Sequence, residues 1–253
     1  MPRERVYRTE AIVLRRRDFG EADRLLTLYT PERGKMNALA KGARKPTSRK
    51  AGHVELYIRS ELLLAQGRDL DIVTQAETVD SYRPLREDLL RTSYASYCVE
   101  LLDKFTVENV ENQPLYELLG AALGWICTAR DLQLTTRYYE LQLLSLVGYQ
   151  PELYRCVSRG EVIQAEDQFF SVADGGVLCP ACGPQRPGAV PISQAALKLM
   201  RYFQSNSYDR VAALNVRPLV HAELERVLHR YITYILERQL KSVQFLRLVR
   251  REA

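Results

Sequence analysis

The spacing of the apolar residues changes once along this chain of 253 residues, at Tyr82, and this change restricts the fold more than any other feature. Upstream of Tyr82, apolar residues recur at about every second position and β-forming residue types dominate, as in strands with one buried face. Downstream they recur every three to five positions, as on the buried face of a helix. The pattern predicts a multidomain α+β protein in which a β-rich N-terminal part is followed by helices.

Five short strands are expected upstream of Tyr82, with no helical pattern between them. A hairpin turn is expected at residues 30–34, because Pro31 occupies the second turn position and Gly34 closes the turn. Five strands in a segment this short favour a small closed barrel, of either the oligonucleotide-binding (OB) type or the SH3-like type. The expected strands cover residues 7–16, 24–29, 34–40, 53–64 and 70–79.

The helical part is interrupted by a segment rich in Gly and Pro that contains three of the five cysteines. Before this segment, a helix expected over residues 135–147 ends at Gly148. Helices resume after Ser193, a good N-cap residue, and a later long helix carries His221 and His229 on its expected polar face. The expected domains are a barrel over residues 1–81, a helical domain over residues 82–152 and 192–253, and an inserted, zinc-ribbon-like cysteine loop over residues 153–191.

The excess of positive charge lies in the first 50 residues. They contain 14 Lys and Arg against 6 Asp and Glu, whereas the rest of the chain contains 22 cations and 25 anions. Residues 41–50 (KGARKPTSRK), here called the basic loop, hold five cations and no anion between two expected strands. Like charges on a loop repel one another, and a polyanion relieves that repulsion. This pattern favours a nucleic-acid-binding module; the alternatives are a solvated basic face and a surface that binds an acidic protein partner.

Contact with nucleic acid is expected mainly through phosphates. Only four aromatic residues fall in the barrel segment, and some of them must fill its core, so few remain to stack on bases. Phosphate contacts predict weak sequence preference and strong salt dependence. The candidate contact residues are the cations on or beside the first strands: Arg15, Arg16, Arg24, Lys35, Lys41, Arg44, Lys45, Arg49 and Lys50.

The cysteines suggest an incomplete metal site. Cys179 and Cys182 form a CxxC knuckle, with Cys156 upstream. A structural zinc site needs four ligands, and the position that would supply the fourth holds Arg159, which cannot bind a metal. The residues leave two alternatives: zinc held by three cysteines, or a loop held by packing with Cys156 as a buried thiol. A redox role is disfavoured, because the Gly- and Pro-rich residues after Cys182 cannot open a helix.

The sequence lacks the motifs of common enzyme classes. Gly34 and Lys35 are followed by Met36, so there is no phosphate-binding P-loop, and no GxGxxG, HExxH or GxSxG pattern occurs. No apolar run is long enough for a membrane helix, and five cysteines are too few and too irregular for a disulfide framework. The chain is therefore expected to be a cytoplasmic protein that is not an enzyme.

Several ordered motifs occur along the chain. In the N-terminal part these are residues 10–14 (EAIVL), 18–23 (DFGEAD), 30–35 (TPERGK) and 40–45 (AKGARK). Further motifs are residues 148–151 (GYQP) and 175–182 (GGVLCPAC). Together these motifs resemble one family, the bacterial recombination protein RecO, and the resemblance covers nearly the whole chain.

The resemblance implies an OB barrel, a helical domain and, in many members, a zinc-binding loop. It also implies binding of single- and double-stranded DNA, annealing of complementary strands, and loading of the RecA recombinase together with RecR onto strands coated by single-strand-binding protein, at the bacterial nucleoid. A hydrophobic pocket on the helical domain receives the acidic tail of that protein in some members. The family's DNA-binding positions correspond to Arg15, Arg16, Lys35, Lys41, Arg44, Lys45, Arg49 and Lys50. Its zinc ligands correspond to Cys156, Cys179 and Cys182, with Arg159 as the departure.

Overall fold

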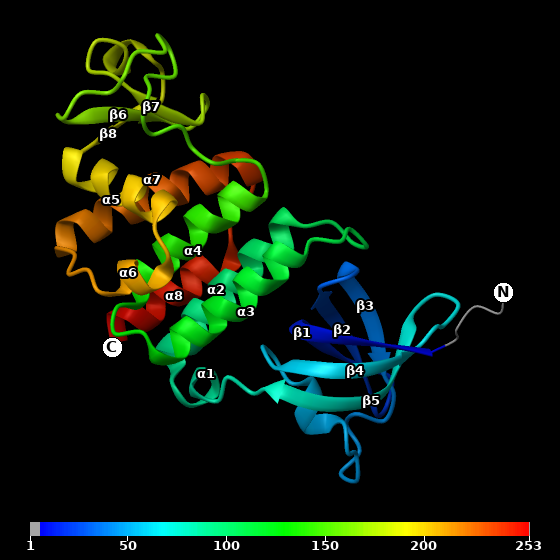
Figure 1. The fold of residues 1–253 in the computed structure, drawn as a ribbon. Helices are drawn as coiled ribbons and strands as arrows, with labels where there is room; N and C mark the ends of the chain where they lie inside the picture. Colours follow the sequence, from blue (N-terminus) through cyan, green and yellow to red (C-terminus); the bar gives the residue numbers. More distant parts are fainter. Residues whose placement is uncertain (1–5, 253) are drawn as a thin grey trace. The chain divides into compact units, whose positions relative to one another are not determined.

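The computed structural model describes residues 6–252, which form two compact units (Figure 1). The first unit contains the described residues up to Cys127 together with those from Phe245 onward, and the second contains Thr128–Gln244. The barrel and the first helices after it, up to Cys127, therefore belong to one unit. Within the described residues, no helix combines the length and the apolar character needed to cross a membrane.

The first unit begins with a closed five-stranded barrel, as the apolar period predicts. Its strands follow the order β1-β2-β3-β5-β4, in which only β3 and β5 pair in parallel. Alternate residues of each strand point inward and form the core, for example Leu26, Ala38 and Leu62, which have no exposed surface. This arrangement confirms the OB-type fold. The strands are β1 (Val6–Phe19), β2 (Asp23–Thr30), β3 (Gly34–Ala40), β4 (Arg59–Ala65) and β5 (Asp71–Asp80).

The start of β4 differs from the expectation. The strand was expected over residues 53–64, but Ala51–Val54 form a short 3-10 helix and β4 begins only at Arg59. Tyr57 adopts a left-handed backbone conformation, with φ of 67°, which an extended strand does not allow. The Nδ1 atom of His53 accepts a hydrogen bond of 3.1 Å from the N–H of Thr78, so this turn is held against β5.

Helices complete the first unit. These are α1 (Pro84–Glu87), α2 (Leu89–Phe105), α3 (Gln113–Thr128) and, from Phe245 onward, α8, which as a whole covers Lys241–Glu252. The sequence interpretation did not identify α8, because its apolar residues are outnumbered by polar ones. Helix α8 returns to the first unit, where Arg250 Nε donates a hydrogen bond of 2.7 Å to the hydroxyl of Tyr94 on α2.

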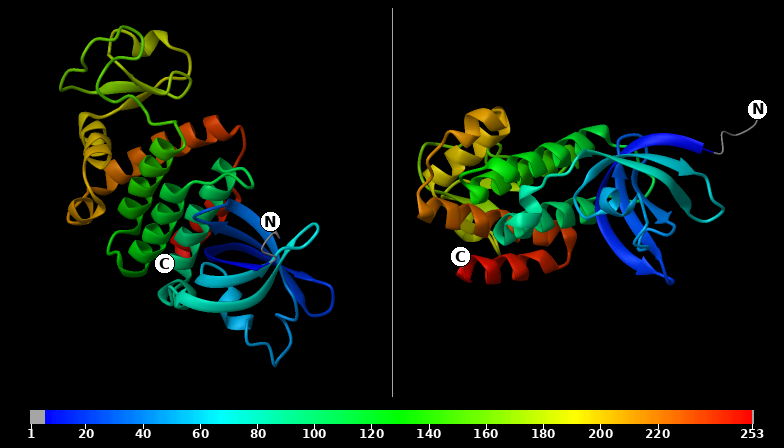
Figure 2. Two further views of the ribbon diagram at one scale, coloured as in Figure 1. Left: turned by 45° about the vertical axis from the view of Figure 1, so that its right-hand side comes forward. Right: turned by 90° about the horizontal axis from the view of Figure 1, so that it is seen from below.

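The second unit consists of helices and the cysteine insertion. Helix α5 begins after Ser193, whose hydroxyl accepts a hydrogen bond from the N–H of Ala196, which confirms the predicted N-cap. The insertion contains a small sheet of order β7-β6-β8, not anticipated from the sequence, and forms a lobe at one end of the helices (Figures 1 and 2). The elements of the second unit are α4 (Leu132–Leu146), β6 (Gln168–Ser171), β7 (Gly176–Leu178), β8 (Val190–Ile192), α5 (Gln194–Ser205), α6 (Tyr208–Ala212) and α7 (Pro218–Leu236).

His221 is buried, which corrects the expectation that it lies on the polar face of its helix. It lies on α7, and its Nε2 atom is 2.9 Å from Oδ2 of Asp131, the residue that precedes α4. Asp131 also caps α4, because its Oδ1 atom accepts a hydrogen bond of 2.9 Å from the N–H of Leu134. No local pattern indicates this pair, because the two residues are far apart along the chain.

We expect Asp131 to contribute to stability only above strongly acidic pH. Burial raises the pKa of its carboxyl group, but the His221 ring and the N–H groups of Leu134 and Gln133 lower it more, so the pKa lies below its usual value. Because the pKa of Asp131 is lower in the folded than in the unfolded protein, its contribution is present above the unfolded pKa of about 3.9. The contribution is lost as the pH falls through the folded pKa. Asp131→Asn should therefore flatten the decline in stability below about pH 4.

The test is to measure the midpoint of urea unfolding for the wild type and for Asp131→Asn at a series of pH values between neutral and acidic. Asparagine keeps the size of the side chain and its capping oxygen, so the comparison isolates the charge. Parallel curves for the two proteins throughout the acidic range would contradict this role of Asp131.

Candidate nucleic-acid interface

The basic loop lies at one end of the barrel and is tied to the turn between β1 and β2. The N–H of Arg44 donates a hydrogen bond of 2.9 Å to the carbonyl of Ala22, and the N–H of Gly42 donates one of 2.8 Å to Oδ1 of Asp23. Gly42 has a φ of 65°, a conformation that glycine adopts without steric cost. The loop contains only turns and bends, as predicted, and these bonds hold it in place.

Four exposed cations at this end of the barrel have no partner within residues 6–252. They are Arg17 on β1 and Lys41, Lys45 and Arg49 in the basic loop. Their side chains form no hydrogen bond or ion pair with any other residue between positions 6 and 252. Such free cations have no role in stabilising the fold and are available to an anionic ligand.

Two other cations of the loop are anchored to the barrel. The guanidinium of Arg44 lies 3.3 Å from Oδ2 of Asp18 and donates to the carbonyl of Glu21. The amine of Lys50 donates a hydrogen bond of 2.8 Å to the carbonyl of Val73. Burial lowers the pKa of Lys50, although nearby Asp23 acts in the opposite direction. These two residues fix the loop as well as adding positive charge.

Arg16 and Arg24 share a carboxylate partner. Both guanidinium groups pair with Glu55, at 3.1 Å and 2.7 Å, and the Arg24 side chain is only 16% exposed. Arg24 lies two positions before the core residue Leu26 on β2, so the two side chains share the inner side of the strand, and Arg24 lies at the end of the barrel. Its charge is neutralised there within the protein.

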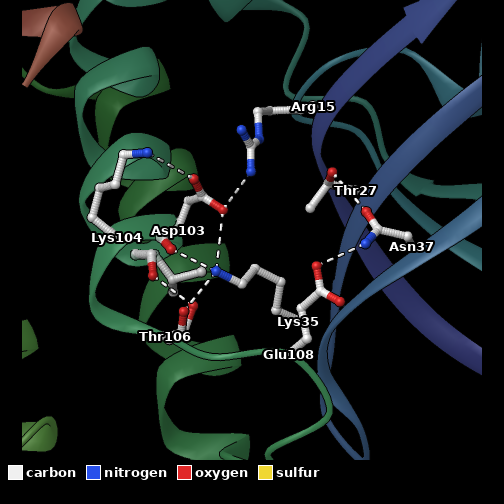
Figure 3. Close-up of polar contacts among 9 residues, drawn as sticks. Arg15, Thr27, Lys35, Asn37, Asp103, Lys104, Thr106 and Glu108 are labelled. Atoms are coloured by element: carbon white, nitrogen blue, oxygen red, sulfur yellow. Dashed lines mark hydrogen bonds and ion pairs between the residues drawn. The ribbon is translucent and has the colours of Figure 1, made fainter.

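Lys35 occupies a buried site beside α2 (Figure 3). Its amine donates hydrogen bonds of 2.6 Å to the backbone carbonyls of Asp103 and Thr106, and it lies 3.3 Å from Oδ1 of Asp103. These carbonyls belong to the last turn of α2, where a positive charge interacts favourably with the helix dipole. Arg15 reaches the same carboxylate oxygen at 2.9 Å but remains 60% exposed.

The segment after α2 packs directly on β3. The N–H of Asn109 donates a hydrogen bond of 2.8 Å to the carbonyl of Lys35, and the amide of Asn37 donates one of 2.8 Å to Glu108. A Cβ atom on Gly34 would lie 1.9 Å from the carbonyl oxygen of Val110, so only glycine fits there. The Gly34–Lys35 pair therefore fastens the helical segment to the barrel.

The three cysteines of the insertion converge as their spacing suggested. The sulfur atoms of Cys156, Cys179 and Cys182 all lie within 4.8 Å of one another. Burial raises the pKa of Cys156, but the N–H groups of Cys179, Ser158 and Arg159 outweigh burial and lower it to about 7. A thiolate is the form that binds metals, so this donor set fits three positions of a zinc site. Arg159 is exposed and offers no fourth ligand.

Two exposed residues at this end of the barrel are not among the contact residues that the sequence predicts: Arg17, one of the four cations described above, and Phe19. Arg17 and Phe19 are exposed at the end of β1. Regular alternation from Val13, a core residue, would turn both inward, but the register of β1 against β2 shifts between Val13 and Arg15. This β-bulge reverses the two faces of the strand. A bulge leaves no clear mark in a single sequence.

A closed OB-type barrel with a fixed, cationic loop defines the class of this N-terminal module. Comparison with known proteins then gives the family. The model of "Recombination protein O N terminal" matches residues 3–82, and that of "Recombination protein O C terminal" matches residues 86–244. The chain belongs to the recombination protein O (RecO) family.

Individual relatives agree with the family models. A protein named "DNA repair protein RecO" from Roseiflexus sp. (strain RS-1) is 45% identical over 244 residues, which cover 96% of this chain and 86% of the relative. Proteins with the same name from Pelotomaculum thermopropionicum and Dehalococcoides mccartyi (strain ATCC BAA-2266 / KCTC 15142 / 195) are 39% and 35% identical. These two alignments cover 96% and 95% of this chain, and 94% of each relative.

Proposed function

We propose that this chain is a DNA repair and recombination mediator without catalytic activity of its own. It binds single- and double-stranded DNA at the basic end of its barrel and anneals complementary strands. The observation that supports this most is a group of four exposed cations that have no partner among the described residues, Arg17, Lys41, Lys45 and Arg49, around a loop that is held by hydrogen bonds. Annealing requires neutralised phosphates and free base edges. Exposed cations neutralise the phosphates and leave the base edges free to pair.

The family resemblance extends the proposal to protein partners. In this proposal the chain acts with RecR, displaces or bypasses single-strand-binding protein, and thereby assists loading of RecA at the bacterial nucleoid. A mediator that neutralises phosphates locally lowers the electrostatic barrier to pairing of strands coated by single-strand-binding protein.

Annealing of complementary oligonucleotides coated with single-strand-binding protein tests the function. We expect rapid duplex formation with the protein and very slow formation without it, and a strong decline as salt rises. A protein that leaves the annealing rate unchanged at low salt would contradict the proposal.

We propose further that the cysteine cluster holds one zinc ion through Cys156, Cys179 and Cys182. The supporting observation is the convergence of three sulfur atoms within 4.8 Å. Bound zinc would supply a structural cross-link of the insertion, because Cys156 precedes the small sheet and the other two cysteines follow β7.

Metal analysis of protein purified without added metal tests this. We expect about one zinc per chain from a single site, a loss of zinc in Cys182→Ser, and no loss in Cys127→Ser, whose thiol lies outside the cluster. A chelator should lower the melting temperature of the wild type. Metal-free protein whose melting temperature does not respond to a chelator would show that packing alone holds the loop.

A further inference from the structure

The outer face of β1, β2 and β3 can be followed residue by residue from their pairing. Arg15 lies opposite Thr27, and Thr27 opposite Asn37; one step further along the strands, Arg17 lies opposite Leu25, and Leu25 opposite Leu39. These residues alternate with core residues such as Leu26 and Ala38, so they share the outer side of the barrel. In OB-type barrels the outer face of strands 2 and 3 is the usual surface for nucleic acid.

One half of this face is covered by the protein's own chain. Figure 3 shows Arg15, Thr27, Lys35 and Asn37 projecting from the strands towards α2 and the segment after it. The contacts of Arg15 with Asp103 and of Asn37 with Glu108 fill this half. A nucleic acid strand therefore has freer access to the other half, here called the distal face: Arg17, Phe19, Leu25, Leu39 and Lys41. In the first half, only the Arg15 side chain remains largely exposed among the four residues named, at 60%.

Phe19 is the only barrel aromatic among the described residues with a freely exposed ring. It is 48% exposed, and no aromatic ring or guanidinium of residues 6–252 stacks on it. Tyr29 and Tyr57 are buried at 1% and 8% exposure, and the Tyr7 ring is covered by Arg33 at 3.9 Å. An exposed phenylalanine beside half-buried leucines is an apolar surface that bases can cover.

The distal face is also held in shape before any ligand arrives. Phe19 pairs with Asp23 across the β1–β2 turn, and Asp23 accepts the N–H of Gly42 from the basic loop. Ala22, in the same turn, accepts the N–H of Arg44. A ring on a fixed turn loses little conformational entropy on binding, so stacking there is favourable.

We propose that Phe19 stacks on an unpaired base of single-stranded DNA, while Arg17 and Lys41 on the same face contact the flanking phosphates. This inference rests on the proposed DNA binding and assigns it a base-contacting residue. Because bases inside a duplex are already stacked, Phe19 favours single strands over duplex. The basic loop, in contrast, acts on both forms through charge alone.

The test measures binding of a thymine oligonucleotide and of a duplex by wild type, Phe19→Ala and Phe19→Tyr. We expect Phe19→Ala to weaken single-strand binding roughly 5- to 100-fold, the range for loss of one stacked base. Duplex binding and the salt slope should stay unchanged, and Phe19→Tyr should bind like the wild type. Val79→Ala on β5 is the matched control, since Val79 is also 48% exposed. Equal melting temperatures would show that each variant is folded.

An oligonucleotide with abasic positions provides a second arm. Wild type and Phe19→Ala should bind it equally, because no base is present to stack. The inference is overturned if Phe19→Ala binds thymine oligonucleotide as tightly as Val79→Ala, or if it loses single-strand and duplex binding to the same extent. If the wild type binds neither DNA, the proposed function itself fails, and this inference fails with it.

Discussion

Replacing Lys35 with methionine is expected to cost about 3 kcal/mol of folding free energy, near the lower end for a buried ion pair that loses one partner. The amine satisfies two carbonyls at the end of α2 and the carboxylate of Asp103, which is only 6% exposed. Methionine fills the same volume but leaves these acceptors unpaired. Arg15 and Lys104 still face Asp103, which keeps the cost from being larger.

Urea unfolding measures the loss, and Lys45→Met is the matched control. Lys45 is an exposed lysine of the same barrel without a partner among residues 6–252, so its replacement should change stability by less than about 0.5 kcal/mol. Under conditions in which it is folded, Lys35→Met should bind single-stranded DNA as the wild type does. Equal stability of Lys35→Met and wild type, combined with weakened DNA binding, would return Lys35 to the interface.

Charge reversal of Lys41, Lys45 and Arg49 together is expected to weaken single-strand binding on the order of 100-fold at low salt. The slope of log affinity against log salt should fall by about 2, at roughly 0.7 for each lost phosphate contact. The three side chains have no partner within the described residues, so the fold should not be affected. Salt titrations of the variant and wild type measure both quantities.

Reversal of Arg130, Lys198 and Arg217 is the control for net charge. These exposed cations lie in the second unit, and their reversal changes the total charge by the same amount. If both triple variants lose affinity equally, binding depends on the overall charge and not on the basic loop.

The sequence predicts much of this fold because its pattern is local. The change of period at Tyr82 separates strands from helices, and Gly42 and Pro46 mark the basic loop as a turn region. Ser193 and Pro218 likewise mark the beginning of two helices correctly. In each case the signal and the structure that it specifies lie within a few residues of each other.

The sequence does not reveal features whose deciding partner is distant or that lie on an irregular strand. Lys35 has the sequence context of a surface cation, but its acceptors are 68 and 71 positions away. His221 has the spacing of a polar-face residue, yet Asp131 on another helix accounts for its burial. Phe19 would point inward by simple alternation, and one bulge at Leu14 turns it outward.

A titration with single-stranded DNA at two salt concentrations tests most directly whether the N-terminal module binds DNA through phosphates. We expect clear binding at low salt and a large loss at high salt, with little dependence on base sequence. A module that instead binds an acidic protein partner would show no appreciable DNA binding at either concentration, and that result would contradict the account.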